Sequence, residues 1–261
     1  MKQLPDFSSV TELAGDEVSQ EQVERICHRY YWAGQYCAGK DVLEVACGSG
    51  QGLGYLATVA KSVEAGDYTE KILNIARARY CDRISLKLFD AQDMPYADNS
   101  KDVIIMYEAL YYIPSAAKFV AECRRVLRPG GQVLIATANK DLYDFNPSPF
   151  TFEYHGVVEL GQLFAKHGFL SECFGYMPIS EVSLRQKILR PVKKLAVMLG
   201  LIPKTTQGKK FFKRLVFGGL VKMPVDITAD MFPYEAPQPL APAVPDREHK
   251  VIYCAATLPG E

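Results

Sequence analysis

A short apolar segment that runs into a glycine-rich turn, residues 41–54, most constrains how this chain can fold. Val42, Leu43 and Val45 predict a buried strand, because apolar and β-branched residues favour strands. Leucines and alanines then recur at helical spacing, which predicts a helix from about Gln51. A strand, a glycine turn and a helix together allow backbone N–H groups and a helix N-terminus to approach a ligand closely.

The spacing of the glycines disfavours a nicotinamide dinucleotide as that ligand. Its fingerprint is Gly-x-Gly-x-x-Gly, in a turn between a strand and a helix. The pair Gly48 and Gly50 is followed by Leu53 at the third position, and the pair Gly50 and Gly52 by Tyr55. Neither pair therefore completes the fingerprint.

The residues from Glu44 to Gly50, EVACGSG, resemble motif I of the class I S-adenosylmethionine-dependent methyltransferases, which is acid-x-Gly-x-Gly-x-Gly. Ala46 replaces the first glycine, and we expect it to keep the site small but to lose access to positive φ. The resemblance implies S-adenosylmethionine as cofactor and S-adenosylhomocysteine as product. It places Glu44, Ala46, Gly48 and Gly50 at the cofactor site.

Strands and helices alternate over about 100 residues after this turn, which predicts an α/β fold with a parallel, doubly wound sheet. The sequence Arg128-Pro-Gly-Gly131 predicts a turn after a helix over 115–127. The resemblance implies a Rossmann-like sheet of seven strands, with an antiparallel last strand over 249–258. The earlier strands are expected at 42–45, 62–66, 84–89, 103–106, 132–138 and after Phe169.

Four regions are expected along the chain. Residues 1–40 form an N-terminal helical segment, and residues 41–180 form the cofactor-binding core. Residues 181–247 form a basic helical insertion with a proline-rich return, because the distance between the last two strands far exceeds a hairpin. Residues 248–261 supply the last strand.

Three further predicted strand ends carry side chains suited to a cofactor. Open parallel sheets bind ligands beyond the carboxyl ends of their strands, where Asp67, Asp90 and Tyr107 stand. In the family, the acid after the second strand binds the ribose hydroxyls, which matches Asp67, and Tyr68 would pack on the adenine. Asp90 and Ala91 match the positions that meet the adenine amino group and ring nitrogen.

Methyl transfer requires few catalytic residues besides those that bind the cofactor. Methyl transfer needs mainly an aligned nucleophile, and a base only where the nucleophile carries a proton. Tyr112 stands where related small-molecule enzymes carry a histidine, and it either positions a substrate hydroxyl or forms an aromatic wall. His155 is the predicted base near the substrate. Tyr30, in a helix expected over 19–38, either packs that helix on the sheet or covers the cofactor.

Composition adds few constraints. The 30 basic and 30 acidic residues balance, so net charge favours neither nucleic acid nor membrane. Seven scattered cysteines without a CxxC pair predict free thiols in a reducing cytoplasm. No apolar signal segment opens the chain, and no apolar run reaches about 18 residues, so we expect a soluble cytoplasmic protein. The histidine spacing predicts no metal site.

The basic insertion leaves three interpretations open. Residues 182–225 contain eleven lysines and arginines and no acid, and the segment 209–216 separates basic from apolar residues on a helical wheel. It forms a helical cap on the core, or a basic amphipathic surface over 185–222 for a membrane or lipid-linked acceptor. RNA binding is the third, although no recognisable RNA-binding module accompanies it.

The sequence thus predicts methyl transfer from S-adenosylmethionine to a small-molecule, saccharide or lipid-linked acceptor. An RNA methyltransferase that uses the basic insertion is one alternative. A non-catalytic S-adenosylmethionine-binding protein is another. A nicotinamide oxidoreductase is disfavoured by the incomplete glycine pattern.

Overall fold

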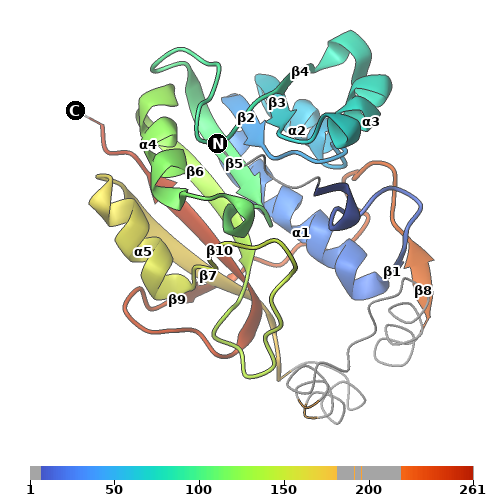
Figure 1. Cartoon of the computed structure of the whole chain (residues 1–261), viewed down its shortest axis with the longest axis vertical. Coiled ribbons are helices and arrows are strands. Elements are labelled where there is room, and N and C mark those ends of the chain that lie inside the picture. Colours follow the sequence, from blue (N-terminus) through green and yellow to red (C-terminus); the bar gives the residue numbers. More distant parts are fainter. Residues whose placement is uncertain (1–6, 181–190, 192–194, 196–218, 261) are drawn as a thin grey trace.

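A mixed sheet of eight strands forms the middle layer of the computed structural model, which describes residues 7–180, 191, 195 and 219–260 (Figure 1). The strands are β2 (Asp41–Val45), β3 (Ser62–Asp67), β4 (Ser85–Leu88), β5 (Lys101–Tyr107), β6 (Leu127–Ala138), β7 (Leu170–Pro178), β9 (Gln238–Leu240) and β10 (His249–Thr257). They lie in the order β4-β3-β2-β5-β6-β10-β7-β9.

The pairing of these strands confirms the predicted sheet. β4, β3, β2, β5 and β6 pair in parallel, whereas β10 lies antiparallel between β6 and β7. The eighth strand, β9, comes from the proline-rich return and pairs with the edge of β7. That strand was not predicted, because three residues that include a proline carry no strand pattern.

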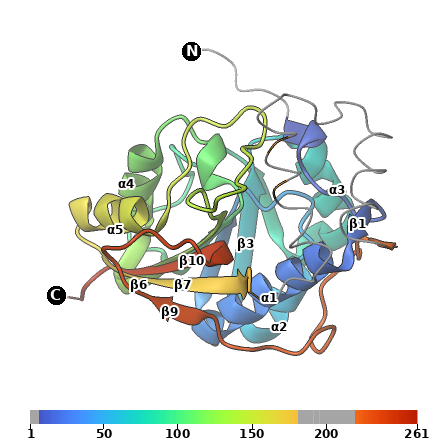
Figure 2. The same ribbon diagram turned by 90° about the horizontal axis from the view of Figure 1, so that it is seen from below.

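Helices cover both faces of the sheet, as Figure 2 shows. Along β5, Val103 and Ile105 pack with α1 on one face, while Ile104 and Met106 pack with α4 and α5 on the other. This continuous burial is typical of a central parallel strand. No helix in the described ranges is both long and apolar enough to cross a membrane. The helices are α1 (Gln20–Cys37), α2 (Leu53–Val59), α3 (Glu70–Tyr80), α4 (Ala116–Val126) and α5 (Val157–Lys166).

Helix α1 begins where the sequence predicts. Ser19 is its N-cap: the Ser19 hydroxyl oxygen accepts a hydrogen bond from the Gln22 backbone amide, and the Gln22 side-chain oxygen accepts one from the Ser19 backbone amide, so that a complete capping box forms. Trp32 stacks on Tyr253 of β10, with ring centroids 4.7 Å apart. The helix is therefore fixed on the sheet by its aromatic residues.

A two-stranded ribbon, absent from the sequence predictions, lies beside α1. β1 (Glu17–Ser19) pairs antiparallel with β8 (Leu220–Lys222). The end of the basic stretch is thereby tied to the residues that precede α1. Most of the predicted helical insertion lies outside the described residues, so its helices remain a prediction.

The turn predicted at Arg128–Gly131 is instead part of β6. Lys101 pairs with Leu127 and Val103 pairs with Gln132, so four residues bulge opposite one. Gly130, with a φ of +80°, allows this irregularity. The Arg128 guanidinium stabilises it by binding acids in neighbouring strands, at 3.0 Å from Asp41 and 2.8 Å from Asp102.

His28 links α1 to three distant parts of the chain. Its Nδ1 lies 2.9 Å from the Tyr253 hydroxyl, and its Nε2 lies 2.7 Å from the Glu235 carbonyl oxygen. Its ring stacks on Tyr176. Because the imidazole is buried, its pKa is lowered to about 4.

We expect the free energy of unfolding to decrease as the pH falls below the ordinary histidine pKa of 6.5. The unfolded chain then binds a proton that folded His28 accepts only near pH 4. From about pH 7.5 to about pH 5 this group should remove about 2 kcal/mol of stability. Urea denaturation of the wild type and His28→Gln at both pH values isolates the effect. An equal loss in both proteins would contradict it.

Candidate functional site

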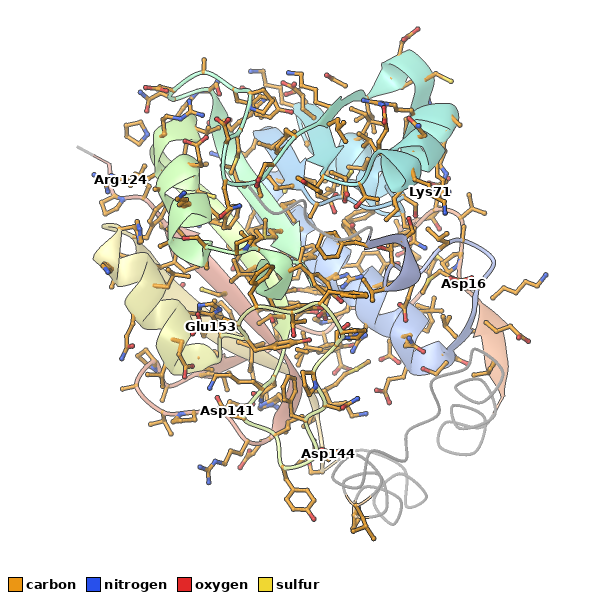
Figure 3. All side chains as sticks on the ribbon, in the orientation of Figure 1. Asp16, Lys71, Arg124, Asp141, Asp144 and Glu153 are labelled. Atoms are coloured by element: carbon orange, nitrogen blue, oxygen red, sulfur yellow. The ribbon has the colours of Figure 1, made fainter. Side chains whose placement is uncertain are left out.

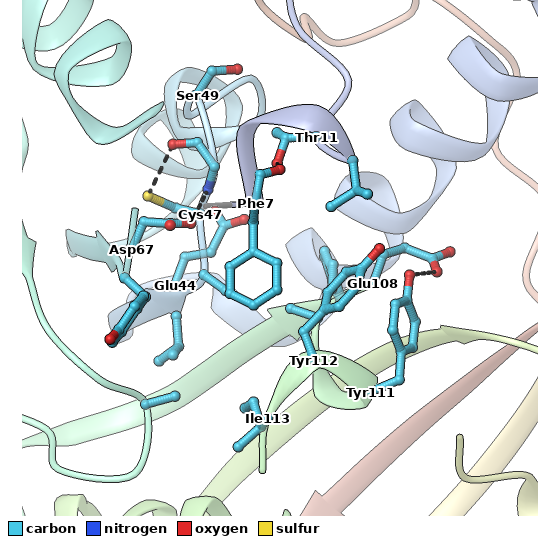
Figure 4. Close-up of a pocket in the computed structure, with 18 of the residues that line it drawn as sticks. Phe7, Thr11, Glu44, Cys47, Ser49, Asp67, Glu108, Tyr111, Tyr112 and Ile113 are labelled. Carbon is cyan, nitrogen blue, oxygen red and sulfur yellow. Dashed lines mark hydrogen bonds between the residues drawn. The ribbon is translucent and has the colours of Figure 1, made fainter. Parts of the chain in front are cut away.

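A cavity of about 320 Å³ opens at the carboxyl ends of β2, β3 and β5 (Figure 4). The N-terminal segment crosses it through Phe7 and Thr11, and α1 forms another wall. Gly50, one of the predicted cofactor residues, does not line the cavity, whereas the others do. They are Tyr30, Glu44, Ala46, Gly48, Asp67, Tyr68, Asp90, Ala91 and Tyr107.

Glu44 lies in the cavity wall that the strand ends form, near the carboxyl end of β2. Its side chain is 2% exposed, and its Oε1 accepts a hydrogen bond of 2.6 Å from the Tyr30 hydroxyl. Its other oxygen, Oε2, is buried without a partner among the described residues. Burial raises the pKa of Glu44 to about 7, although the bond from Tyr30 opposes this shift. The carboxyl group is therefore ready to accept a further donor or a positive charge.

Asp67 joins the glycine turn to the end of β3. Its Oδ2 accepts a hydrogen bond of 2.9 Å from the Gly48 amide, and its Oδ1 accepts one of 2.8 Å from the Thr69 amide. Burial raises the pKa of Asp67, against the lowering effect of these amides. The turn and the strand end are thus held together by one buried carboxylate.

The expectation that Ala46 would lose access to positive φ is wrong, because its φ is +56°. A left-handed alanine costs on the order of 1 kcal/mol, and the surrounding structure must compensate. The next amide, that of Cys47, donates to the Gly66 carbonyl at 3.0 Å and fixes the turn. Gly48, with a φ of +57°, continues the left-handed path.

Two later glycines explain how the turn meets its neighbours. A Cβ on Gly52 would lie 2.1 Å from the Tyr30 ring, so only glycine allows that ring to reach Glu44. Gly50 turns away from the cavity, and its carbonyl accepts a hydrogen bond of 2.7 Å from Tyr80. Gly50 therefore shapes the turn without forming the cavity wall.

The side of the cavity next to β4 carries the residues predicted for the adenine. The Asp90 carboxylate accepts a hydrogen bond of 2.9 Å from the Gln92 amide, which orients it. Ala91 lies beside it, and Tyr68 is 39% exposed at the rim. The three residues form one partly open, partly aromatic wall.

Glu108, which the sequence analysis did not select, stands at the opposite end of the cavity. It has a φ of +51°, a strained conformation for a residue with a Cβ. Its Oε2 accepts a hydrogen bond of 3.0 Å from Tyr111, drawn in Figure 4, and its Oε1 is buried without a partner among the described residues. Glu108 follows β5 directly, so the strand-end rule that selected Asp67 and Asp90 could also have found it.

Tyr112 lines the cavity and contacts the N-terminal segment. Its ring centroid lies 5.1 Å from that of Phe7, and its hydroxyl shares a hydrogen bond of 2.6 Å with Ser148. Burial raises its pKa above the ordinary tyrosine value, which makes it a poor base at neutral pH. The position supports the interpretation of Tyr112 as an aromatic wall.

His155 lies away from the residues that line the cavity. It is buried just before α5, its Nδ1 has no partner among the described residues, and its Nε2 lies 3.9 Å from Glu153. Burial lowers its pKa. This geometry gives His155 no contact with the cavity, so it provides no support for the predicted role as a base.

The residues present fit S-adenosylmethionine. The cofactor carries an ammonium group, a sulfonium and ribose hydroxyls, which need acidic or hydroxyl partners. Two buried oxygen atoms of residues that line the cavity lack hydrogen-bond partners among the described residues and can supply them. They are Glu44 Oε2 and Ser49 Oγ.

Comparison with known sequences also indicates a methyltransferase. A family model described as a methyltransferase domain matches residues 43–135. A probable S-adenosylmethionine-dependent methyltransferase of Mycolicibacterium smegmatis is 36% identical over 150 residues, which cover 56% of this chain and 55% of that protein. Methyltransferase GfsG of Streptomyces halstedii is 36% identical over 138 residues, which cover 51% and 48%. The chain thus spans about half the length of the curated relatives it matches.

Solved structures share the fold over most of the chain. The YcgJ protein of Bacillus subtilis has a TM-score of 0.58 at 15% identity, covering 90% of this chain and 99% of that one. Phosphoethanolamine N-methyltransferase 2 of Haemonchus contortus, solved with S-adenosyl-L-methionine, has a TM-score of 0.56 at 18% identity, covering 92% and 53%. The chain therefore contains a methyltransferase domain over residues 43–135, which include Glu44, Asp67 and Asp90, and S-adenosylmethionine is the cofactor of this domain.

Proposed function

We propose that this chain transfers the methyl group of S-adenosylmethionine to a hydroxyl group of a small molecule, such as a saccharide or a lipid-linked acceptor. The observation that carries the proposal is the division of one cavity into two ends. Glu44 and Asp67 form the cofactor end. At the other end, Glu108 Oε1 has no hydrogen-bond partner among the described residues and lies 3.9 Å from Arg29 Nη1. A hydroxyl nucleophile needs such a base, because its proton must leave as the new bond forms.

The cofactor end holds and orients the methyl donor. When bound, S-adenosylmethionine supplies an electrophilic methyl group. Asp67 would hold the ribose hydroxyls, and Asp90 with Ala91 would hold the adenine. Glu44 would bind the positively charged methionine part, and Arg29, which also lines the cavity, would bind its carboxylate. Orientation of this kind contributes ~7–11 kcal/mol when the geometry is good.

Glu108 receives the proton of the acceptor in this proposal. Tyr111 donates to its Oε2, which leaves Oε1 free to accept the hydroxyl proton. The strained backbone of Glu108 holds the carboxylate toward the cavity. Phe7, above Tyr112, helps to exclude water from this end.

Observations outside the cavity support the proposed class of acceptor and the proposed cellular compartment. The relative named phthiotriol/phenolphthiotriol dimycocerosates methyltransferase 1, 39% identical over 37% of this chain and 37% of its own, supports a lipid-linked acceptor. The basic stretch 185–222 would then contact a membrane or lipid phosphate; of this stretch, β8 is described and pairs with β1. The free thiols of the seven cysteines support a reducing cytoplasm.

Glu108→Gln should lower kcat by about 10²–10⁴, because the amide cannot take the proton. Affinity for S-adenosylmethionine should stay within about twofold. The measurement is the rate of S-adenosylhomocysteine formation, with an acceptor identified by screening sugars, nucleotide sugars and lipid-linked sugars. Glu70→Gln, at an exposed position of α3, is the matched control. Full activity of Glu108→Gln would remove the proposed base.

Binding of S-adenosylmethionine at about pH 6 should release up to one proton. Glu44, with a pKa of about 7, is mostly neutral there, and the cationic cofactor favours its ionised form. Affinity should therefore rise from about pH 5 to about pH 7.5. Titration calorimetry in buffers of different ionisation enthalpy counts the protons. Equal proton release from Glu44→Gln and the wild type would assign the proton to another group.

A further inference from the structure

Two arginines on consecutive turns of α1, Arg25 and Arg29, line the cavity without a hydrogen-bonding partner. The Nε atoms of both are buried and unsatisfied among the described residues. Arg29 Nη1 lies 3.9 Å from Glu108 Oε1, beyond hydrogen-bond distance. Arg25 has neither a hydrogen bond nor an acidic oxygen within 4.0 Å in the described part of the chain. A guanidinium is always charged and carries five donors, so its partial burial without a partner is costly.

The acids nearest Arg25 are each engaged by another group. Glu12 accepts a hydrogen bond from the Gln22 amide. Glu21 pairs with Lys250 at 2.7 Å. Glu108 accepts from Tyr111. These acids act on Arg25 only through space, so its Nε–H has no acceptor among the described residues, in a side chain that lines the cavity.

The two arginines lie at different positions along the cavity. The Arg29 carbonyl accepts a hydrogen bond of 3.1 Å from Tyr107, and its guanidinium lies 3.9 Å from Glu108, so Arg29 stands between the cofactor end and the acceptor end. Arg25 lies one turn earlier, about 6 Å along the helix axis. There its charge interacts with Glu12 and Tyr111, at the acceptor end.

We propose that Arg25 binds an anionic group, a carboxylate or a phosphate, carried by the methyl acceptor. The inference rests on the proposed function and adds the chemical class of the acceptor. A planar guanidinium binds carboxylate and phosphate oxygens through paired, charge-assisted hydrogen bonds. Binding there would position the acceptor hydroxyl next to Glu108, which lies within the same wall.

The test uses the full chain saturated with S-adenosylhomocysteine. Sodium acetate and sodium phosphate are titrated separately against sodium chloride at matched ionic strength. The side-chain Nε–Hε signals of the arginines are followed by nuclear magnetic resonance, with Arg25→Lys used to assign the Arg25 signal. We expect a saturable shift of the Arg25 signal with one of the two anions, and the anion that binds distinguishes a carboxylate from a phosphate.

Calorimetry under the same conditions compares anion binding by the wild type with anion binding by matched variants. Arg25→Gln should weaken anion binding by about tenfold or more, and Arg25→Lys should retain part of it. Arg124→Gln should leave it unchanged, because Arg124 projects from the outside of α4 and bonds only the His167 carbonyl (Figure 3). Circular dichroism confirms that each variant is folded.

Absence of a saturable Arg25 shift with both anions, or equal anion affinity in Arg25→Gln, would overturn the inference. Failure of S-adenosylhomocysteine to bind would instead count against the proposed function, because its binding is measured first in the same sample. The two failures are therefore distinguishable.

Discussion

A buried carboxyl group at the end of the central strand is the constraint on which the rest of this site depends. β2 is covered on both faces, and Glu44 near its carboxyl end is buried. The Tyr30 hydroxyl of α1 donates a hydrogen bond to it, and Gly52 leaves room for the Tyr30 ring. The contact fixes α1 over the strand ends, and the cavity forms between them.

The parts of the fold set by local pattern were predictable from the sequence. The apolar run of β2, the cap at Ser19 and the alternation of strands and helices give the core and its direction. β9 and the β1–β8 ribbon were not predictable, because three-residue strands depend on distant partners rather than on their own pattern. The bulge in β6 was missed because Pro and Gly signal a turn equally well.

Some residues of the candidate site could likewise be predicted from the sequence, and others could not. The strand-end acids were predictable because parallel strands bring their carboxyl ends to one edge. Arg25 was not selected, although its spacing of four residues from Arg29 places both on one face of a helix. The sequence alone did not show that this face of the helix lines the cavity. The role predicted for His155 stays a prediction, since nearness in sequence to the expected acceptor helix indicates neither its burial nor its absence from the residues that line the cavity.

The two ends of the cavity come from different parts of the chain. Most residues of the cofactor end lie within the matched domain, 43–135, and Tyr30 joins them from α1. The acceptor end draws also on the N-terminal segment, on Arg25 of α1 and on Ser148, which lie outside that match. The proposed acceptor specificity thus depends on segments that flank the domain, while the cofactor site depends mainly on the domain itself.

The most direct test of the account is calorimetric binding of S-adenosylmethionine to the wild type and to Asp67→Ala, with NADH as the comparison ligand. The account predicts saturable binding of S-adenosylmethionine and none of NADH. It predicts a loss of about 1.5–3 kcal/mol in Asp67→Ala, the scale for hydrogen bonds to a charged group, while the exposed control Asp82→Ala binds normally. Unchanged affinity in Asp67→Ala, or binding of NADH in place of S-adenosylmethionine, would contradict it.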